Sequence, residues 1–199
     1  MWRSLKDLGK NSFNEGDFDQ ALEHFQQCLD IQLATLEHNH PEIALSYNNL
    51  GAVYGTKGDY EMALEYHNKT LAIQLKTIGK NHPHVALSYK NIGLDYDGIG
   101  ENNQAVESFL KAIEIYFNLG LAHQDNSDFD LAIEYYSNAL EIQLDILGEG
   151  HWDIAAIIYQ NLGTAHEGKD DYDTAIEFFQ KAVDLRIDRK STRLNSSHY

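Results

Sequence analysis

Small and large apolar positions recur along this chain in one fixed order. A glycine that follows leucine or isoleucine is itself followed, twelve residues later, by an alanine and, sixteen residues later, by an aromatic residue or histidine. The later part of each repeat places apolar residues at i, i+3, i+4 and i+7, which is the spacing of one helix face. The pattern therefore predicts an all-α chain of about five helical hairpins, which start near Gly9, Gly51, Gly93, Gly120 and Gly163.

The small positions of the repeat indicate where the two helices of a hairpin cross. Glycine and alanine let the helices approach closely, and aromatic residues such as Phe25 and Tyr136 fill the space between hairpins. Cys28 occupies one of the alanine-type positions, so we expect it to be buried. Turn residues precede each second helix, and Asp59 and Asp171 are predicted to cap two of these helices.

This register resembles the tetratricopeptide repeat, whose pattern is roughly W-x2-L-G-x2-Y followed by A-x3-F. The resemblance covers residues 4 to about 187 and implies a right-handed α-solenoid of helix-turn-helix repeats. The period is 42 residues rather than about 34, as in the repeats of kinesin light chains. The extra length lies in a longer second helix and in a linker that reads Asn39-His40-Pro41, Asn81-His82-Pro83 and, with departures, Gly150-His151-Trp152. Proline suits the first turn of the helix that follows.

One step of the repeat is short. Gly93 and Gly120 are 27 residues apart, and the shortfall of 15 residues falls between Ile115 and Tyr116. No residue in this region breaks a helix, so the sequence predicts one fused helix from about 104 to 125. It would divide the chain into repeats 1–3 (residues 1–115) and repeats 4–5 (residues 116–187).

The last twelve residues, 188–199, differ in character from the repeats. They resemble the translation of a sequencing adapter, and we expect a non-native or disordered tail. No C-terminal capping helix is recognisable, whereas a solenoid usually needs one to cover its last apolar face. We therefore expect the chain to be part of a longer protein.

Composition narrows the range of functions. The net charge of −16 comes without a basic stripe, which argues against nucleic-acid binding. No apolar run approaches the roughly 20 residues of a membrane span, and the single cysteine favours the cytoplasm. The histidines around Pro41 and Pro83 belong to the linkers and lack the spacing of a metal site. We expect no catalysis, no cofactor, no metal and no small-molecule substrate, because no motif for them occurs.

The resemblance implies that first helices line a concave groove and that three positions around each glycine face it. Four amides stand in equivalent places, and they suit either clamping an extended peptide or tying neighbouring helices together. Lysines and asparagines of the first three repeats partly resemble a carboxylate clamp, although Leu87 stands where that clamp has a basic residue. The predicted groove residues are Lys6, Lys10, Asn48, Asn49, Lys90, Asn91, Asn118, Gln160 and Asn161.

The sequence therefore predicts an adaptor or scaffold that holds a peptide or a protein partner in its groove. One alternative is a structural spacer or sensor arm within a larger signalling protein. A second alternative is a chaperone cofactor that uses the carboxylate clamp.

Overall fold

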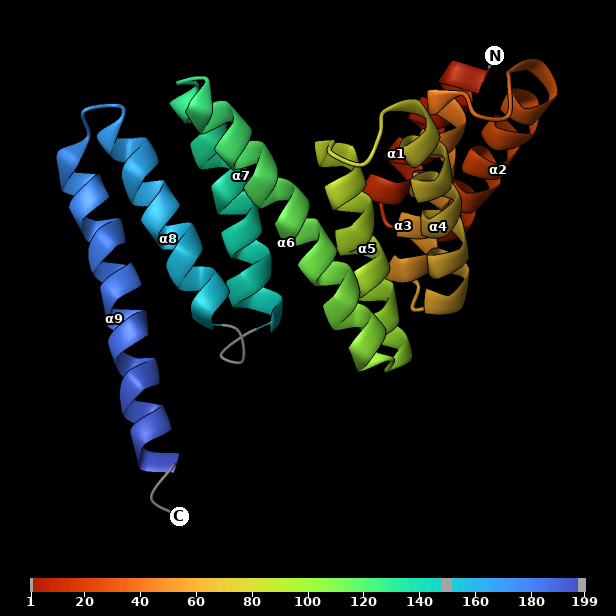
Figure 1. The fold of residues 1–199 in the computed structure, drawn as a ribbon. Helices are drawn as coiled ribbons and strands as arrows, with labels where there is room; N and C mark the ends of the chain where they lie inside the picture. Colours follow the sequence, from red (N-terminus) through yellow and green to blue (C-terminus); the bar gives the residue numbers. More distant parts are fainter. Residues whose placement is uncertain (1, 148–151, 197–199) are drawn as a thin grey trace. The chain divides into compact units, whose positions relative to one another are not determined.

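Helices joined by short turns and linkers make up the part of the chain that the structure describes. This computed structural model describes residues 2–147 and 152–196, without the side chains of 188–196. No strand occurs among these residues, so the predicted all-α fold is confirmed (Figure 1). The elements are α1 (Trp2–Asn14), α2 (Phe18–Thr35), α3 (Pro41–Thr56), α4 (Tyr60–Thr77), α5 (Pro83–Ile99), α6 (Asn102–Asp125), α7 (Phe129–Ile142), the π-helical turn η1 (Gln143–Leu147), α8 (Trp152–Glu167) and α9 (Tyr172–Ser196).

The fused helix predicted from the short step is confirmed. α6 runs without a break from Asn102 to Asp125 and serves as second helix of the third hairpin and first helix of the fourth. The chain forms two compact units, residues 1–108 (unit 1) and 109–199 (unit 2), and α6 contributes to both. The predicted division after residue 115 stays a prediction.

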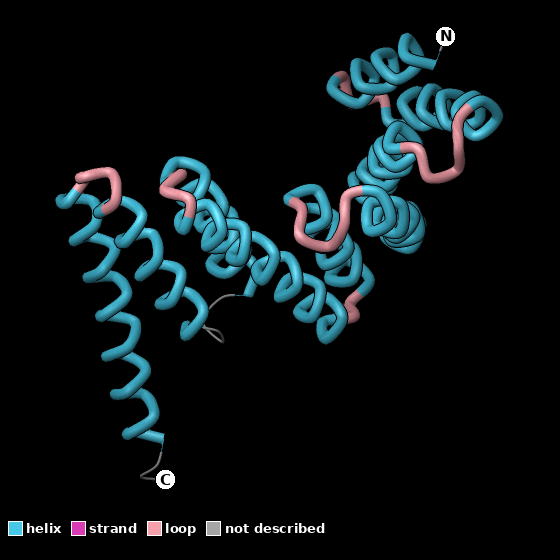
Figure 2. Tube along the Cα trace, turned by 45° about the horizontal axis from the view of Figure 1, so that its top comes forward, coloured by secondary structure: helices cyan, strands magenta, loops and turns pink. Residues whose placement is uncertain are grey.

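Short turns connect the two helices of the early hairpins (Figure 2). Gly16 and Gly58 have φ of 81° and 82°, a left-handed backbone that glycine adopts without steric cost. Asp17 and Asp59 then accept backbone N–H groups of the following helix, at 3.1 and 3.3 Å. These bonds satisfy donors that a helix start leaves free.

The crossing positions pack as the repeat predicts. A side chain on Gly9 would place its Cβ 2.6 Å from the Phe25 ring, and one on Gly163 would lie 2.6 Å from Phe179. Helices can approach this closely only because glycine lacks a Cβ. Cys28 is fully buried as expected, and burial raises the pKa of its thiol.

The linker histidines cap helices. Nδ1 of His40 accepts the backbone N–H of Glu42, and Nδ1 of His82 accepts that of His84, each at 3.1 Å. Proline follows each histidine in the first helical turn, as predicted. The sequence assigned these histidines to the linker but did not give them this role. The third linker lies largely outside the described residues, which resume at Trp152.

The His82 cap should make α5 sensitive to acid. Burial, and then the neighbouring His84, lower the pKa of His82 below its ordinary 6.5. The folded state therefore favours the neutral ring, and the stability that the cap contributes is present above pH 6.5 and is lost as pH falls below it. Asparagine caps equally well and does not titrate, so His82→Asn should match the wild type at pH 7.5. At pH 5 it should be more stable by about 1 kcal/mol.

Urea unfolding followed by circular dichroism at both pH values measures this difference. Groups distant from residue 82 titrate alike in the two proteins, so the difference between them reports on residue 82 together with its coupling to His84. Equal losses of stability in both proteins would contradict the role of His82 as a titrating cap.

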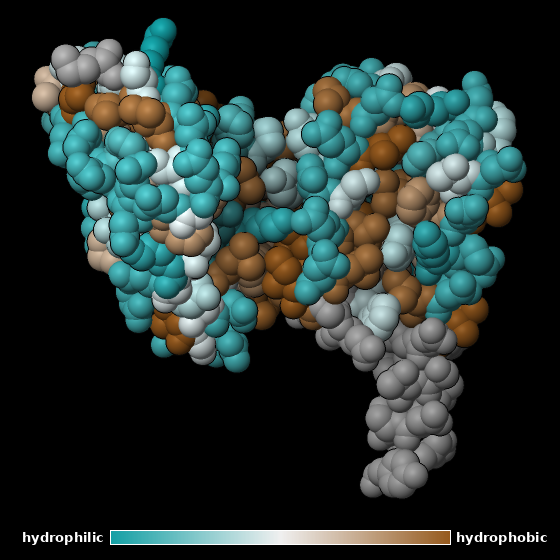
Figure 3. Space-filling model, turned by 180° about the vertical axis from the view of Figure 1, so that it is seen from behind, coloured by the Kyte–Doolittle hydropathy of each residue, from teal (hydrophilic) through white to brown (hydrophobic). Residues whose placement is uncertain are grey.

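The last helix is longer than the sequence suggested. The backbone of α9 continues to Ser196, into the segment 188–199 that the sequence predicts to be a non-native or disordered tail, and that assignment stays a prediction. In unit 2, Tyr172, Ile176 and Val183 of α9 are exposed apolar side chains, and hydrophobic patches appear among hydrophilic ones in Figure 3.

Candidate functional site

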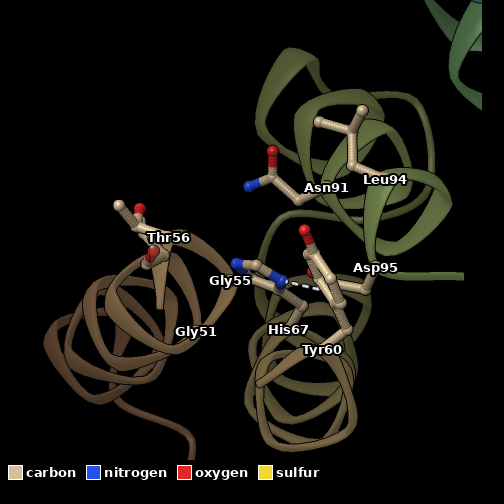
Figure 4. Close-up of a pocket in the computed structure, with 9 residues that line it drawn as sticks. Gly51, Gly55, Thr56, Tyr60, His67, Asn91, Leu94 and Asp95 are labelled. Carbon is tan, nitrogen blue, oxygen red and sulfur yellow. Dashed lines mark hydrogen bonds and ion pairs between the residues drawn. The ribbon is translucent and has the colours of Figure 1, made fainter. Parts of the chain in front are cut away.

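Two equivalent clefts open between successive first helices of unit 1. The first cleft lies between α1 and α3 and has a volume of about 150 Å³, and the second lies between α3 and α5 and has about 270 Å³. Each residue of the first cleft lies 42 positions before a residue of the second, so the repeat itself builds both. The first is lined by Lys10, Phe13, Asn14, Phe25, Asn49 and Ala52, and the second by Gly51, Ala52, Gly55, Thr56, Tyr60, His67, Asn91, Leu94 and Asp95 (Figure 4).

The floors of the two clefts differ in chemistry. At the first cleft, Phe25 of α2 and Val53 of α3 belong to one buried apolar cluster. At the second, the equivalent positions hold His67 of α4 and Asp95 of α5, which are only 4% and 3% exposed. Nδ1 of His67 lies 2.5 Å from Oδ2 of Asp95, the contact dashed in Figure 4. A buried polar pair therefore replaces an apolar one.

Most of the predicted groove residues of unit 1 lie at or beside these clefts. Lys10 and Asn49 line the first cleft, and Asn91 lines the second. Asn91 also donates from Nδ2 to Oδ1 of Asn48 at 3.4 Å, so this amide connects α5 to α3. Lys6 forms an ion pair with Glu42 at 3.0 Å. Both uses proposed for the amides, peptide binding and helix tying, are therefore available at Asn91.

Lys90 belongs to α5 and is partly buried. The remaining predicted residues lie in unit 2, where they are not brought into one cleft. Asn118 is exposed on α6, and Gln160 accepts a hydrogen bond from Nη2 of Arg186 at 2.7 Å. Asn161 donates to the backbone of its own helix at 2.9 Å.

Unit 2 has a cleft of its own, which is almost wholly apolar. It lies between α6 and α8 and has a volume of about 210 Å³. Because α6 is one fused helix, residues from both of its halves line the same wall of this cleft. The lining residues are Leu110, Ile113, Glu114, Phe117, Ile154, Ile157 and Ile158.

The His67–Asp95 pair was missed in the sequence, although a signal was present. Of the five equivalent positions, four hold phenylalanine or tyrosine, and only position 67 holds histidine. Two residues after each repeat glycine, Asp95 is the one ionisable side chain among Asn11, Val53, Asp95, Ala122 and Ala165. Each departure looks minor by itself. Only the packing of α4 against α5 shows that the two departures meet.

Comparison with known proteins agrees with the repeat and the helical hairpins. A family model described as tetratricopeptide repeat matches residues 3–76, 57–116 and 114–188. The chain belongs to the tetratricopeptide-repeat family. Repeats of this family form protein-interaction scaffolds, so the chain is a module of that general class. The third match begins at residue 114, inside α6, close to the place where the repeat is short.

Solved tetratricopeptide structures share the fold. A kinesin light chain from Podosopora anserina with nearly identical TPR-like repeats is 23% identical, with a TM-score of 0.51, and the match covers 94% of this chain and 95% of that one. BtubC from P. vanneervenii is 20% identical, with a TM-score of 0.50, over 94% of this chain and 80% of that one. No curated protein matches in sequence. Within the described part of this tetratricopeptide chain, no helix has both the length and the apolar character needed to cross a membrane.

Proposed function

We propose that this chain is an adaptor whose unit 1 binds an extended peptide segment of a partner protein along α1, α3 and α5. The observation that supports this most is the pair of equivalent clefts. Two clefts side by side along one row of helices suit a ligand that offers more than one side chain for binding. An extended peptide presents successive side chains along its length and can occupy both clefts at once, whereas a compact small molecule would occupy one cleft. We place this binding in the cytoplasm, in keeping with a single, buried cysteine.

The polar groups of the clefts suit a peptide backbone. Asn49 and Asn91 occupy equivalent places in the first and second clefts. An amide side chain both donates and accepts hydrogen bonds, so it can pair with a backbone C=O and a backbone N–H of the ligand. Leu94 is 45% exposed at the second cleft and supplies apolar contact beside this amide. Asn118, Gln160 and Asn161 do not line these clefts, and their part in binding stays a prediction.

Peptide-display selection with the full chain tests this proposal. Asn49→Ala/Asn91→Ala should weaken selected peptides by about tenfold or more, because two hydrogen bonds of roughly 0.5–1.5 kcal/mol each are lost. The matched control is Gln26→Ala/Asn68→Ala. These two amides are also 42 residues apart, but they lie exposed on the second helices α2 and α4 and bond only within their own helices.

Enrichment of a shared motif that the cleft variant loses and the control retains would establish a peptide-reading adaptor. If both variants lose binding equally, the clefts are not the site. If no peptide is enriched by folded protein, the alternative gains support, namely a spacer or sensor arm that contacts other parts of its own assembly.

A further inference from the structure

The second cleft of unit 1 has a charged floor that the other repeats lack. Where His67 and Asp95 lie, the equivalent positions of the preceding hairpins hold Phe25 of α2 and Val53 of α3, and those of the last hairpins hold Tyr136 and Ala165, all of them buried. An apolar pair would fill this space without the cost of burying a carboxylate. The polar pair therefore needs an explanation beyond packing.

The hydrogen bonds of His67 indicate its protonation. Nδ1 is within 2.5 Å of the Asp95 carboxylate, so Nδ1 carries a proton that it donates to Oδ2. Nε2 is buried and has no hydrogen-bond partner. A buried N–H without an acceptor is costly, so Nε2 is the unprotonated nitrogen and the ring is neutral. The pair as a whole then carries the single negative charge of Asp95.

No cation balances this charge among the residues that line the second cleft. The lining contains the Asp95 carboxylate, the Asn91 amide and the hydroxyls of Thr56 and Tyr60, but neither lysine nor arginine. Oδ1 of Asp95 faces Gly55, 3.6 Å from where a Cβ on that glycine would lie. Figure 4 shows Asn91, Tyr60 and Asp95 around the same space. Buried charges are normally paired with an opposite charge, and this one is paired only with a neutral ring.

We propose that the second cleft binds a basic side chain, lysine or arginine, of the extended peptide, an inference that rests on the proposed function. The cation would lie above Asp95, with Asn91 and the two hydroxyls accepting its remaining N–H groups. The volume of about 270 Å³ leaves room for one long side chain. The equivalent first cleft has no acid among its lining residues and carries Lys10 at the position of Ala52. The two clefts therefore distinguish charges on the ligand and fix its register.

Binding of four fluorescein-labelled peptide pools to the full chain tests this proposal. The pools are ten residues long with neutral random positions, and each has one fixed arginine, lysine, glutamate or leucine. In 0.15 M salt, which screens distant charges, the wild type should bind the arginine and lysine pools at least tenfold more tightly than the other two. Asp95→Asn and the double variant His67→Phe/Asp95→Val should reduce this preference to less than threefold.

Asp97→Asn is the matched control, because it removes the same charge from an exposed position of α5, two residues from Asp95. It should retain the basic preference, which separates the cleft from the general acidity of a chain with net charge −16. Circular dichroism and thermal unfolding confirm that each variant is folded. The double variant places at positions 67 and 95 the residue types of Phe25 and Val53, which pack together at the first cleft. Its fold is therefore expected to persist.

The outcomes separate two claims, namely that the second cleft binds a basic side chain and that unit 1 binds a peptide at all. Equal loss of preference in Asp95→Asn and Asp97→Asn, or a preference that survives in the double variant, would overturn the assignment of the second cleft. Binding of all four pools with similar affinity would also overturn it while leaving the peptide-binding function intact. Absence of binding to every pool would overturn both.

Discussion

Replacing His67 with phenylalanine should lower the free energy of unfolding by about 3 kcal/mol or more. The phenylalanine ring should fit, because Phe25 occupies the equivalent place against Gly9 as His67 does against Gly51. The loss arises instead at Asp95, which is only 3% exposed. Its carboxylate would no longer accept a hydrogen bond from residue 67. Removing the imidazole leaves the buried carboxylate without the hydrogen bond that it accepts, and an unsatisfied buried group costs more when it is charged than when it is neutral.

The double variant His67→Phe/Asp95→Val should recover this loss. It recreates the apolar pair that Phe25 of α2 and Val53 of α3 form, and its stability should equal or exceed that of the wild type. Asp95→Val alone should cost about 1–3 kcal/mol, because Nδ1 of His67 would remain buried without an acceptor. Urea unfolding of all four proteins, followed by circular dichroism at pH 7, gives the coupling between the two positions. Additive losses would show that the two side chains do not act as a pair.

Replacing Gly51 with alanine should destabilise the protein, whereas the same change at Gly55, one turn later in α3, should stabilise it. A Cβ at residue 51 would lie 2.7 Å from the His67 ring, which its bond to Asp95 holds in place. Crowding of this kind in a packed interior costs typically 1–3 kcal/mol, and it exceeds the helix preference gained. A Cβ at residue 55 would meet its nearest neighbours at 3.6 and 3.7 Å, an ordinary contact. There only the gain of about 1 kcal/mol in helix propensity remains.

Thermal and urea unfolding of the two single variants measures this difference in sign. The two glycines share one helix, so propensity, helix length and solvent conditions are matched between them. Stabilisation of the protein by both changes would mean that the α3–α4 crossing can widen without cost. In a third variant, Gly51→Ala combined with His67→Ala, the two losses of stability should be less than additive, because the ring that the new Cβ meets is no longer there.

The repeat register was readable from sequence because it depends on side-chain size at fixed intervals. Glycine at 9, 51 and 163 and the aromatic or imidazole ring sixteen residues later meet as predicted, since a helix crossing tolerates only a small residue opposite a large ring. The continuity of α6 was also predictable. It follows from local backbone chemistry, namely the absence of any breaker between the two repeats that it joins.

The capping role of the linker histidines could not be predicted from the sequence pattern. The sequence placed His40 and His82 in linkers before a proline, but a ring nitrogen caps a helix only if the backbone turns so that Nδ1 reaches the N–H two residues later. The same holds for the end of α9, which continues into the predicted tail as far as Ser196. Helix ends depend on a few torsion angles that composition does not specify.

The sequence by itself determined that this chain is a tetratricopeptide-type array of helical hairpins with one fused helix, because periodic residue size dictates how helices cross. It also named Lys10, Asn49 and Asn91, which line the clefts of unit 1. Only the tertiary structure decided that His67 and Asp95, 28 residues apart and on different hairpins, form a buried pair beneath the second cleft. Such a contact depends on the packing of α4 against α5 and on the neighbours that exclude water, and neither is local in sequence.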